Sequence, residues 1–437
     1  MVEQSGDWLG PLSDGFSIRG AALTAAPKST LSIYVHVPFC ARRCGYCDFN
    51  TYTAADLGGG ASRLEFAELA LAEVRLAAGL LAADMASAFD IVSVSSVEPF
   101  DLANRSDIGA SPKTAPPEIE TIYFGGGTPT MLPTPHLIQI LNGIRDTFGL
   151  KADAEVSIEA NPDTVTEQSL TELAQAGFTR VSFGMQSAVP KVLEILDRTH
   201  NPVTIPQIVD WATNAGLKSS LDLIYGTPGE SLKDWQYSVE KAIDTGVEHI
   251  SAYALTISPN TKMSRQIAKG HLTEPDDDDL ADKYELADEL LTKAGFEWYE
   301  VSNWARGGIN GPNACQHNLA YWHNQNWWGI GPGAHSHLNG TRFWNQTHPK
   351  KWAEALTSKE LPIEDSEQLT AEQKQLENIF LNIRLASGIK TNGIKNREKQ
   401  ITELIQRGLI KITGAEQRIV LTRQGRLLAD TVVRALT

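Results

Sequence analysis

Short hydrophobic runs alternate with amphipathic stretches through the first 265 residues of the chain. Six runs rich in β-branched and aromatic residues occupy positions 32–37, 121–124, 156–159, 180–183, 220–225 and 249–253. Between them lie stretches with apolar residues at helical spacing, such as 166–176 and 234–245. Strand–helix alternation of this kind predicts a parallel sheet with right-handed crossovers. Six repeats predict an α/β fold with an incomplete (β/α)6 barrel over residues 31–265, short of the closed eightfold form.

The pattern changes on either side of these repeats and once within them. Residues 1–30 are rich in Gly, Ser and Ala without a sustained period, and we interpret them as an N-terminal arm. The first crossover is unusually long, and its part from about 87 to 117 has the low periodicity of a surface insertion. Residues 266–365, with a helix at 280–294, are predicted to be an aromatic-rich extension that packs on the barrel. Residues 366–437 show two helices, a hairpin at 409–412 and 418–421, and a last helix, which predicts a winged-helix-like α+β module.

Composition narrows the classes of protein to which the chain can belong. It has 437 residues, 42% hydrophobic content and only 4 Cys, so sizeable cores are expected and a disulfide-rich secreted scaffold is not. A net charge of −15 argues against nucleic acid as a partner, and the C-terminal unit lacks a dense basic face. The chain shows no secretory signal and no apolar run of membrane-spanning length, so we expect a cytoplasmic protein with reduced thiols.

The most informative motif is the C-x3-C-x2-C run of Cys40, Cys44 and Cys47. Three thiolates are one fewer than the four that close an ordinary iron–sulfur cluster, so one iron of a [4Fe-4S] cluster would keep an open position. The residues alone leave open a structural Cys3His zinc site that includes His36. Cys315 lies far away in sequence and is interpreted as a buried thiol. The acidic run at 276–279 is better explained as the N-terminal cap of the following helix than as a metal site.

Polar and glycine-rich motifs follow several of the predicted strands. Three glycines, 125 to 127, come directly after the second strand, Glu159 ends the third, and Gln186 follows the fourth. Because the carboxyl ends of parallel strands share one rim, these motifs are expected to converge on one active site. The glycine run is not a phosphate-binding loop, since G-x4-G-K-[ST] is absent. Asp222 and Arg198 could serve the same site, or each could be a structural ion pair.

Residues 34–47 together with 125–130 resemble the radical S-adenosylmethionine (SAM) superfamily. Over roughly residues 30–430 the chain is similar to the branch that contains oxygen-independent coproporphyrinogen III oxidases and haem chaperones of the HemW type. The resemblance implies a [4Fe-4S] cluster on Cys40, Cys44 and Cys47, with SAM on the open iron. It places three residues at SAM-contacting positions, namely Tyr34, Gly126 and Glu159. Further ligand positions, which in the oxidase serve a second SAM, are matched by Tyr46, Gly127, Thr128, Gln186, Arg198 and Asp222.

Two positions separate the two kinds of protein in that branch. The oxidase pattern has a fourth cysteine two residues after the third, and this chain has Phe49 there. The segment from His317 to Trp322 matches an H-N-x-x-Y-W motif of the chaperones, which makes His317 and Tyr321 the candidate haem contacts. Seven of the ten tryptophans fall between Trp298 and Trp352 and are suited to an apolar ligand or to covering a core. Competing haem ligands are His323, His335 and His337.

The resemblance therefore implies a haem chaperone that binds the cluster, SAM and haem and transfers haem to an acceptor protein. Membrane-associated respiratory proteins are the candidate class of acceptor, and the cluster implies an electron donor. An oxygen-independent coproporphyrinogen III oxidase is the alternative, followed by a radical SAM methyltransferase. Whether the chain is an enzyme stays open, because the SAM machinery is present while the oxidase cysteine position holds Phe49.

Overall fold

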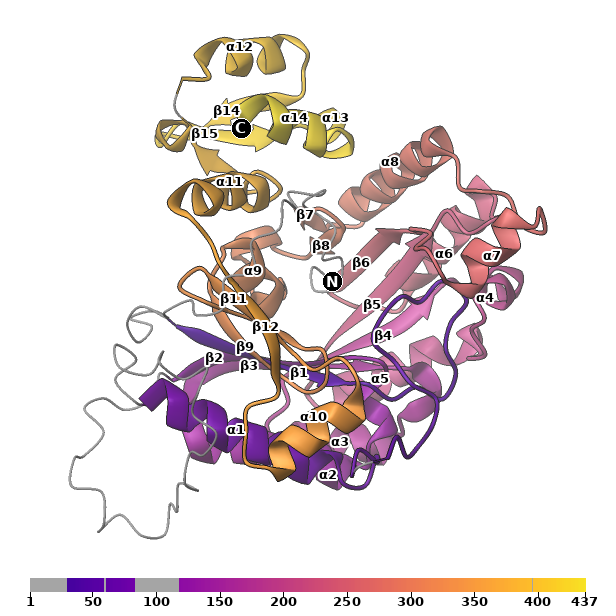
Figure 1. Cartoon of the computed structure of the whole chain (residues 1–437). Coiled ribbons are helices and arrows are strands. Elements are labelled where there is room, and N and C mark those ends of the chain that lie inside the picture. The colour runs from indigo at the N-terminus through magenta and orange to yellow at the C-terminus, as the bar shows by residue number, and fades with distance from the viewer. Residues whose placement is uncertain (1–29, 59, 83–117, 395) are drawn as a thin grey trace.

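The computed structural model describes residues 30–58, 60–82, 118–394 and 396–437 (Figure 1). The predicted N-terminal arm, apart from residue 30, and the insertion at about 87–117 lie outside these ranges. Six parallel strands lie side by side in chain order: β1 (Leu31–Val37), β2 (Ile119–Gly126), β3 (Leu150–Ala160), β4 (Arg180–Gln186), β5 (Lys218–Tyr225) and β6 (His249–Ala254). The six strands expected from the hydrophobic pattern are thereby confirmed.

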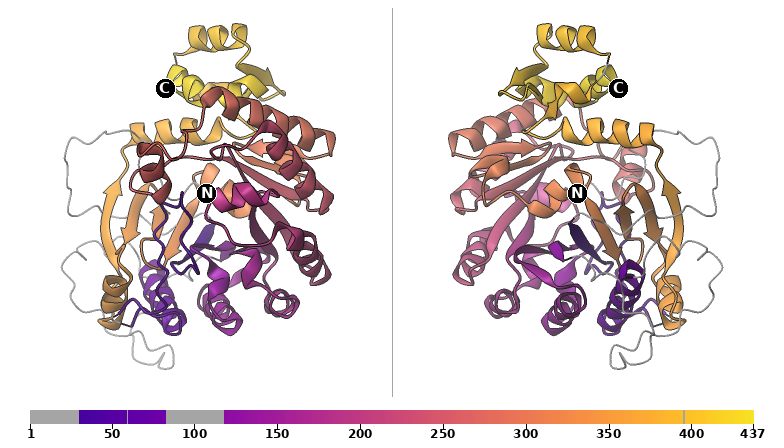
Figure 2. Two further views of the ribbon diagram at one scale, coloured as in Figure 1. Left: turned by 90° about the vertical axis from the view of Figure 1, so that its right-hand side faces the viewer. Right: turned by 90° about the vertical axis from the view of Figure 1, so that its left-hand side faces the viewer.

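Helices cover one face of this curved sheet, as the two views of Figure 2 show. They are α1 (Phe66–Ala82), α2 (Thr134–Phe148), α3 (Glu167–Ala176), α4 (Pro190–Ile195), α5 (Ile205–Asn214) and α6 (Leu232–Asp244). Two of them begin at a side-chain cap: Thr166 accepts the N–H of Ser169 at the start of α3, and Ser231 accepts that of Asp234 at the start of α6. Such caps satisfy backbone N–H groups that have no partner inside a helix.

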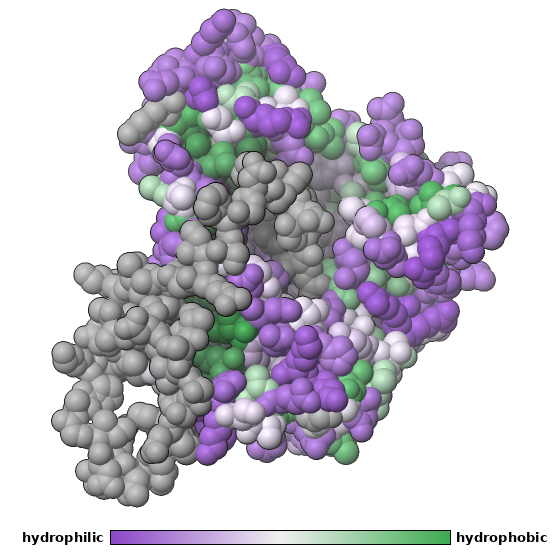
Figure 3. Space-filling model, in the orientation of Figure 1, coloured by the Kyte–Doolittle hydropathy of each residue, from purple (hydrophilic) through white to green (hydrophobic). Residues whose placement is uncertain are grey.

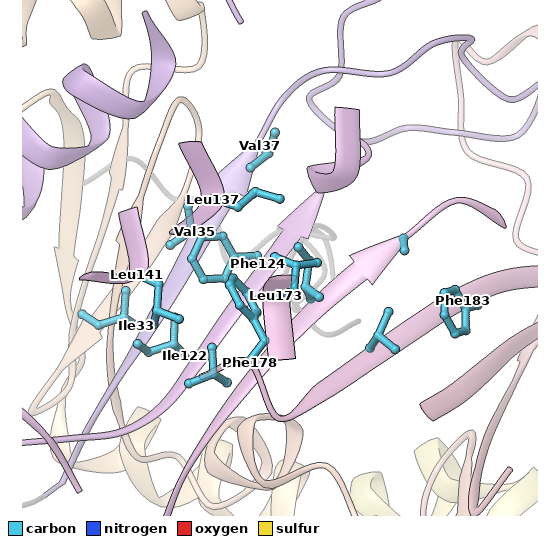
Figure 4. Packing of buried hydrophobic residues seen from close by; sticks show 14 of the residues in the cluster. Ile33, Val35, Val37, Ile122, Phe124, Leu137, Leu141, Leu173, Phe178 and Phe183 are labelled. Carbon is cyan, nitrogen blue, oxygen red and sulfur yellow. The ribbon is translucent and has the colours of Figure 1, made fainter. Parts of the chain in front are cut away.

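The main core lies between the strands and these helices. Val35, Phe124 and Phe183 are strand residues of this core, and Leu137 of α2 and Phe178 of the turn after α3 belong to it as well (Figure 4). The rings of Phe124 and Phe178 lie 5.2 Å apart between centroids. Each such buried side chain contributes roughly 1.5–3 kcal/mol through the hydrophobic effect. Because successive strand residues face opposite sides, the alternate positions lie on the concave face of the sheet. Those positions carry polar and aromatic side chains, which places the chemistry of the chain on that face.

Strands from the segment after β6 extend the sheet at both edges. The order is β12-β11-β10-β9-β1-β2-β3-β4-β5-β6-β8-β7, with β7 (Glu297–Glu300), β8 (Asn303–Ala305), β9 (Asn326–Ile330), β10 (His335–Leu338), β11 (Thr341–Asn345) and β12 (Ile363–Gln368). The helices here are α7 (Lys262–Ala268), α8 (Asp277–Lys293), α9 (Gln316–Trp322) and α10 (Pro349–Thr357). Asp276 caps α8 by accepting the N–H of Asp279, which confirms the capping interpretation of the acidic run. The domain boundaries drawn near residues 265 and 365 stay predictions.

The C-terminal residues form a small α+β unit with its own core. It contains α11 (Ala371–Asn382), β13 (Ile389–Lys390), α12 (Glu398–Gln406), β14 (Ile410–Thr413), β15 (Arg418–Leu421), α13 (Arg423–Leu427) and α14 (Ala429–Leu436), with strand order β13-β15-β14. Ile383, Leu404 and Val432 are buried in its core. The unit lies beside α8 in Figure 1, where Arg426 donates to Asp288 at 2.8 Å. The winged-helix-like module predicted from the sequence is confirmed.

The surface is mostly polar on the face seen in Figure 3, with hydrophobic residues in small groups. This distribution fits a chain in which negative charges outnumber positive ones by 15. Within the described residues, no helix combines the length and the apolar character needed to cross a bilayer.

Candidate functional site

The three motif cysteines lie on the loop that follows β1. Backbone hydrogen bonds between Cys40 and Tyr52 (2.9 Å) and between Tyr52 and Pro38 (2.7 Å) hold the ends of this loop together. Cys40 is buried, while Cys44 and Cys47 are partly exposed, and all three thiols are free. Burial raises the pKa of Cys40 to about 11 and also raises the pKa of Cys47. The thiols of Cys40 and Cys47 therefore stay protonated until a bound metal supplies the charge that stabilises thiolates.

Side chains from loop segments, outside the strands, approach each sulfur. The Oγ1 atom of Thr128 lies 3.9 Å from the Sγ of Cys40, and that of Thr51 lies 3.9 Å from the Sγ of Cys47. The Nη1 atom of Arg198 lies 3.7 Å from the Sγ of Cys44. Hydroxyl and guanidinium donors stabilise sulfur that carries negative charge, so the surroundings fit thiolate ligands of a cluster.

The Cys3His zinc alternative finds no support, because both ring nitrogens of His36 already have hydrogen-bond partners. Its ring is buried, with Nε2 3.0 Å from the carbonyl oxygen of Asn50 and Nδ1 3.1 Å from the hydroxyl of Tyr34. Burial lowers its pKa to about 4. Across the described ranges, no three His, Cys, Asp or Glu side chains converge on a point that could hold a single metal ion. A cluster makes no such demand, since each thiolate binds a different iron.

The glycines at the end of β2 let the backbone pass close to the cysteine loop. Gly126 has φ +108°, and a Cβ there would lie 2.7 Å from the His36 ring. A Cβ on Gly127 would lie 2.7 Å from the carbonyl oxygen of Phe39 and 3.0 Å from the Sγ of Cys40. These distances are too short for a side chain, so both positions require glycine.

We expect Gly127→Ala to displace the cysteine loop, because the added methyl group overlaps the backbone of Phe39. The substitution should reduce the iron content of the reconstituted protein and lower the free energy of unfolding by about 1–3 kcal/mol. Iron analysis and thermal denaturation measure the two effects. Gly79→Ala in α1 is the matched control, since no described atom lies within 4 Å of the position that its methyl group would take, and alanine favours helix. Equal iron content in the two variants would contradict the expected displacement.

A cavity occupies the concave side of β1–β6 next to the cysteine loop. It encloses about 740 Å³, including space open to solvent. Tyr34, Gly126, Glu159 and Asp222 line it from four strands, and Phe49 lines it from the cysteine loop. The structure thus brings together four of the predicted SAM residues. It also places Phe49, the residue at the oxidase cysteine position, against the same cavity.

Two carboxyl groups face this cavity. Glu159 accepts hydrogen bonds from the Tyr123 hydroxyl (2.9 Å) and the Gly126 N–H (3.3 Å). Asp222 accepts one from Ser182 (2.8 Å). Burial, reinforced by the neighbouring Asp222, raises the pKa of Glu159 to about 7, and burial raises the pKa of Asp222. Buried carboxylates of this kind can bind an ammonium group or hydroxyl groups of a ligand.

The remaining predicted ligand residues surround the cysteine loop from the side of β4 and α4. Arg198 donates to the carbonyl of Gly184 (2.8 Å) and to Asn161 (3.2 Å), which ties it to the ends of β3 and β4. Gln186 ends β4 with φ +60°. Its Oε1 atom and the Nε atom of Arg198 are buried and find no hydrogen-bond partner within the described ranges. Tyr46 packs against a small hydrophobic cluster that includes Val192 and Leu196, and burial raises the pKa of Tyr46 well above its usual value.

His317 and Tyr321, the predicted haem contacts, lie on α9 and line the cavity from the other side. The His317 ring is fully buried, with Nδ1 2.7 Å from the hydroxyl of Thr121 and Nε2 2.8 Å from that of Tyr321. Burial lowers its pKa to about 3, so the imidazole is neutral. Of the competing histidines, His323 is exposed and contacts Asn382, while His335 and His337 lie on β10.

Sequence reasoning missed several residues of the cavity, including Tyr123, Arg180 and His249. Arg180 forms a buried ion pair with Glu155 at 3.3 Å, and His249 contacts the Tyr299 hydroxyl at 2.7 Å. The spacing of these residues along their strands could have identified them as residues of the concave face. Each lies an even number of positions from a residue on the concave face of its own strand, for example Arg180 two before Ser182.

Comparison with known proteins places this fold and site in a class. Residues 113–242 match the Radical SAM superfamily. The solved structure of coproporphyrinogen III oxidase (HemN) from Escherichia coli superposes with a TM-score of 0.75 over 95% of this chain and 92% of that chain, at 20% identity. The fold and the superfamily match together define a radical SAM protein.

Relatives of higher identity narrow the class. The chain is 43% identical to "Heme chaperone HemW" of Mycobacterium tuberculosis strain H37Rv, over 95% of this chain and 96% of the relative. It is 30% identical to "Heme chaperone HemW" of Bacillus subtilis strain 168, over 92% and 98% of the two chains. The chain belongs to the HemW family.

Proposed function

We propose that this protein is a haem chaperone, which binds a [4Fe-4S] cluster, SAM and haem and passes the haem to an acceptor protein. The observation that carries the proposal is the similarity, over almost its whole length, to relatives named for this function. We further propose that it works in the cytoplasm, because a reducing compartment keeps the cluster thiols available.

In this proposal Cys40, Cys44 and Cys47 hold the cluster, and the cavity beside them receives SAM. When bound, the cluster and SAM supply one-electron chemistry that needs an electron-donor protein. Tyr34, Gly126 and Glu159 contact SAM, and Glu159 is suited to hold its polar end because Tyr123 and the Gly126 N–H fix the carboxylate. Further ligand positions are assigned to Tyr46, Gly127, Thr128, Gln186, Arg198 and Asp222.

The second candidate function is that of an oxygen-independent coproporphyrinogen III oxidase. The likeness in fold to the Escherichia coli enzyme favours it. Phe49 opposes it, because this side chain lines the cavity with an apolar ring where the oxidase pattern has a thiol. A radical SAM methyltransferase ranks third, since the residues that line the cavity give no specific support for a methyl acceptor.

Haem is assigned to His317 and Tyr321 on α9. An imidazole is a common axial ligand of haem iron, and the aromatic residues around α9 suit a flat macrocycle. Tyr321 and Trp327 pack edge to face at 4.7 Å between ring centroids. The acceptor belongs, in this proposal, to the class of membrane-associated respiratory proteins.

The affinity for SAM should depend on pH through Glu159. Its pKa is raised to about 7, so the carboxylate that accepts hydrogen bonds from SAM forms as the pH rises through that value. We expect SAM to bind about tenfold more tightly near pH 8 than near pH 6, since the ionised fraction rises by that factor. Calorimetry on the cluster-loaded protein measures it. Glu159→Gln should bind weakly with a flat profile, and an unchanged slope in that variant would show that another group is responsible.

Haem transfer tests the proposed function. Haem-loaded protein is mixed with a tagged, haem-free cytochrome, the two are separated, and the haem on each is read from its Soret band. The proposal expects transfer faster than from free haem at the same concentration. Retention of haem, or conversion of coproporphyrinogen III to protoporphyrinogen by the same sample, would contradict it.

A further inference from the structure

The hydrogen bonds around His317 determine which ring nitrogen carries the lone pair. Thr121 donates its hydroxyl proton to Ser32 at 2.8 Å, so its oxygen accepts from the Nδ1–H of His317 at 2.7 Å. That arrangement leaves Nε2 as the acceptor of the Tyr321 hydroxyl at 2.8 Å. The lone pair that an iron atom would use is therefore occupied, and the ring has no exposed surface. Haem ligation by His317 requires this side chain to leave its present position.

Tyr123 connects the buried imidazole to the SAM side of the cavity. Its ring stacks on that of His317, with centroids 5.2 Å apart and planes inclined by 24°. Its hydroxyl donates to the Oε1 atom of Glu159 at 2.9 Å. Its ring also stacks with that of Tyr34, with centroids 6.4 Å apart. One side chain thus contacts two of the residues assigned to SAM and the residue assigned to haem.

The two assigned sites also share space. Tyr34, Glu159 and Asp222 line the same cavity of about 740 Å³ as His317 and Tyr321. A ligand held at Glu159 fixes the Tyr123 hydroxyl, and a fixed Tyr123 keeps His317 stacked and paired with Tyr321. Two effects therefore oppose haem binding when SAM is present. SAM fills part of the cavity that haem would enter, and the Tyr123–His317 stack keeps the imidazole in its buried position.

We propose that SAM and haem bind antagonistically to this protein, and that Tyr123 is the positioning residue that couples the two sites. The inference rests on the proposed function and deepens it. SAM bound at Glu159 keeps His317 buried and paired with Tyr321, and departure of SAM allows His317 to bind haem iron. Coupling of this kind is reciprocal, so haem must weaken SAM binding by the same factor.

The test is haem titration of the cluster-loaded protein, followed at the Soret band, without SAM and with saturating SAM. SAM is expected to raise the Kd for haem about tenfold, within the range usual for coupled sites. Tyr123→Phe keeps the stacked ring and loses the hydroxyl, so the SAM effect should fall well below the wild-type factor, to the part that shared space alone supplies. The control is Tyr225→Phe, a buried tyrosine on β5 outside the cavity lining, which should retain the wild-type effect. Tyr321→Phe should tighten haem binding without SAM, because its hydroxyl occupies Nε2.

Calorimetric titration of SAM with and without haem supplies the reciprocal measurement. Equal factors in the two directions support the proposal. A haem Kd that SAM leaves unchanged would overturn the antagonism. A SAM effect of wild-type size in Tyr123→Phe would overturn the coupling role of Tyr123. Either result leaves the haem chaperone function standing. A wild-type protein that binds no haem would overturn both.

Discussion

Single replacement of Cys40, Cys44 or Cys47 by serine is expected to abolish the visible absorbance of the iron–sulfur cluster. Three thiolates are the minimum that the motif offers, and a serine hydroxyl is a poor ligand for iron at neutral pH because it stays protonated. Each variant should retain less than about a tenth of the wild-type iron and sulfide after anaerobic reconstitution, given the dependence of such sites on ligand count. Iron and sulfide analysis beside the absorption spectrum measures the loss.

Cys315→Ser is the matched control for these variants. Cys315 is a buried free thiol, 3.4 Å from Glu155 and outside the cysteine loop. Burial raises its pKa beyond the ordinary range of thiols, so it stays protonated. The Cys315→Ser protein should keep the wild-type cluster. Loss of the cluster in Cys315→Ser with retention in any one of the three loop variants would reverse the ligand assignment.

His317→Ala is expected to weaken haem binding about 100-fold, which corresponds to roughly 2.8 kcal/mol, because the axial imidazole is lost. The Soret band of the remaining complex should shift as the iron changes its ligand. Haem titration of the cluster-loaded protein measures both effects. His317 must break its hydrogen bonds to Thr121 and Tyr321 before it binds iron. The expected loss of affinity is therefore the free energy of the iron–imidazole bond less the free energy of these two hydrogen bonds.

His323→Ala is the control, since His323 follows the last residue of α9, is exposed and contacts Asn382 through its ring. This variant should bind haem with wild-type affinity. If His323→Ala, rather than His317→Ala, loses the Soret shift, the ligand is His323 and the buried position of His317 is structural. Iron content should be unchanged in both variants, which separates haem loss from general misfolding.

The six core strands could be predicted because each buried strand shows a run of β-branched and aromatic residues. Ile33, Val35 and Val37 are buried in the core, and the glycine run begins within the last two residues of β2, which ends at Gly126. The winged-helix-like module was predictable for the same reason, since its hairpin and helices are local in sequence. The acidic run before α8 was explained by capping, which is also local.

The extension of the sheet could not be predicted from local patterns. β9 pairs in parallel with β1, nearly 300 residues earlier in the chain, and β8 pairs with β6 in the opposite direction. Such pairings depend on long-range contacts that leave no period in the sequence. The role of Tyr123 was hidden for a related reason. Its two partners, Glu159 and His317, come from a neighbouring strand and from a helix almost 200 residues later.

Haem titration and an oxidase assay on one cluster-loaded, anaerobic sample test the central claim most directly. A haem chaperone should give a saturable Soret shift on addition of haem, and no protoporphyrinogen from coproporphyrinogen III in the presence of SAM and a reductant. Formation of protoporphyrinogen at catalytic turnover, without saturable haem binding, would contradict the claim and make the chain an oxidase.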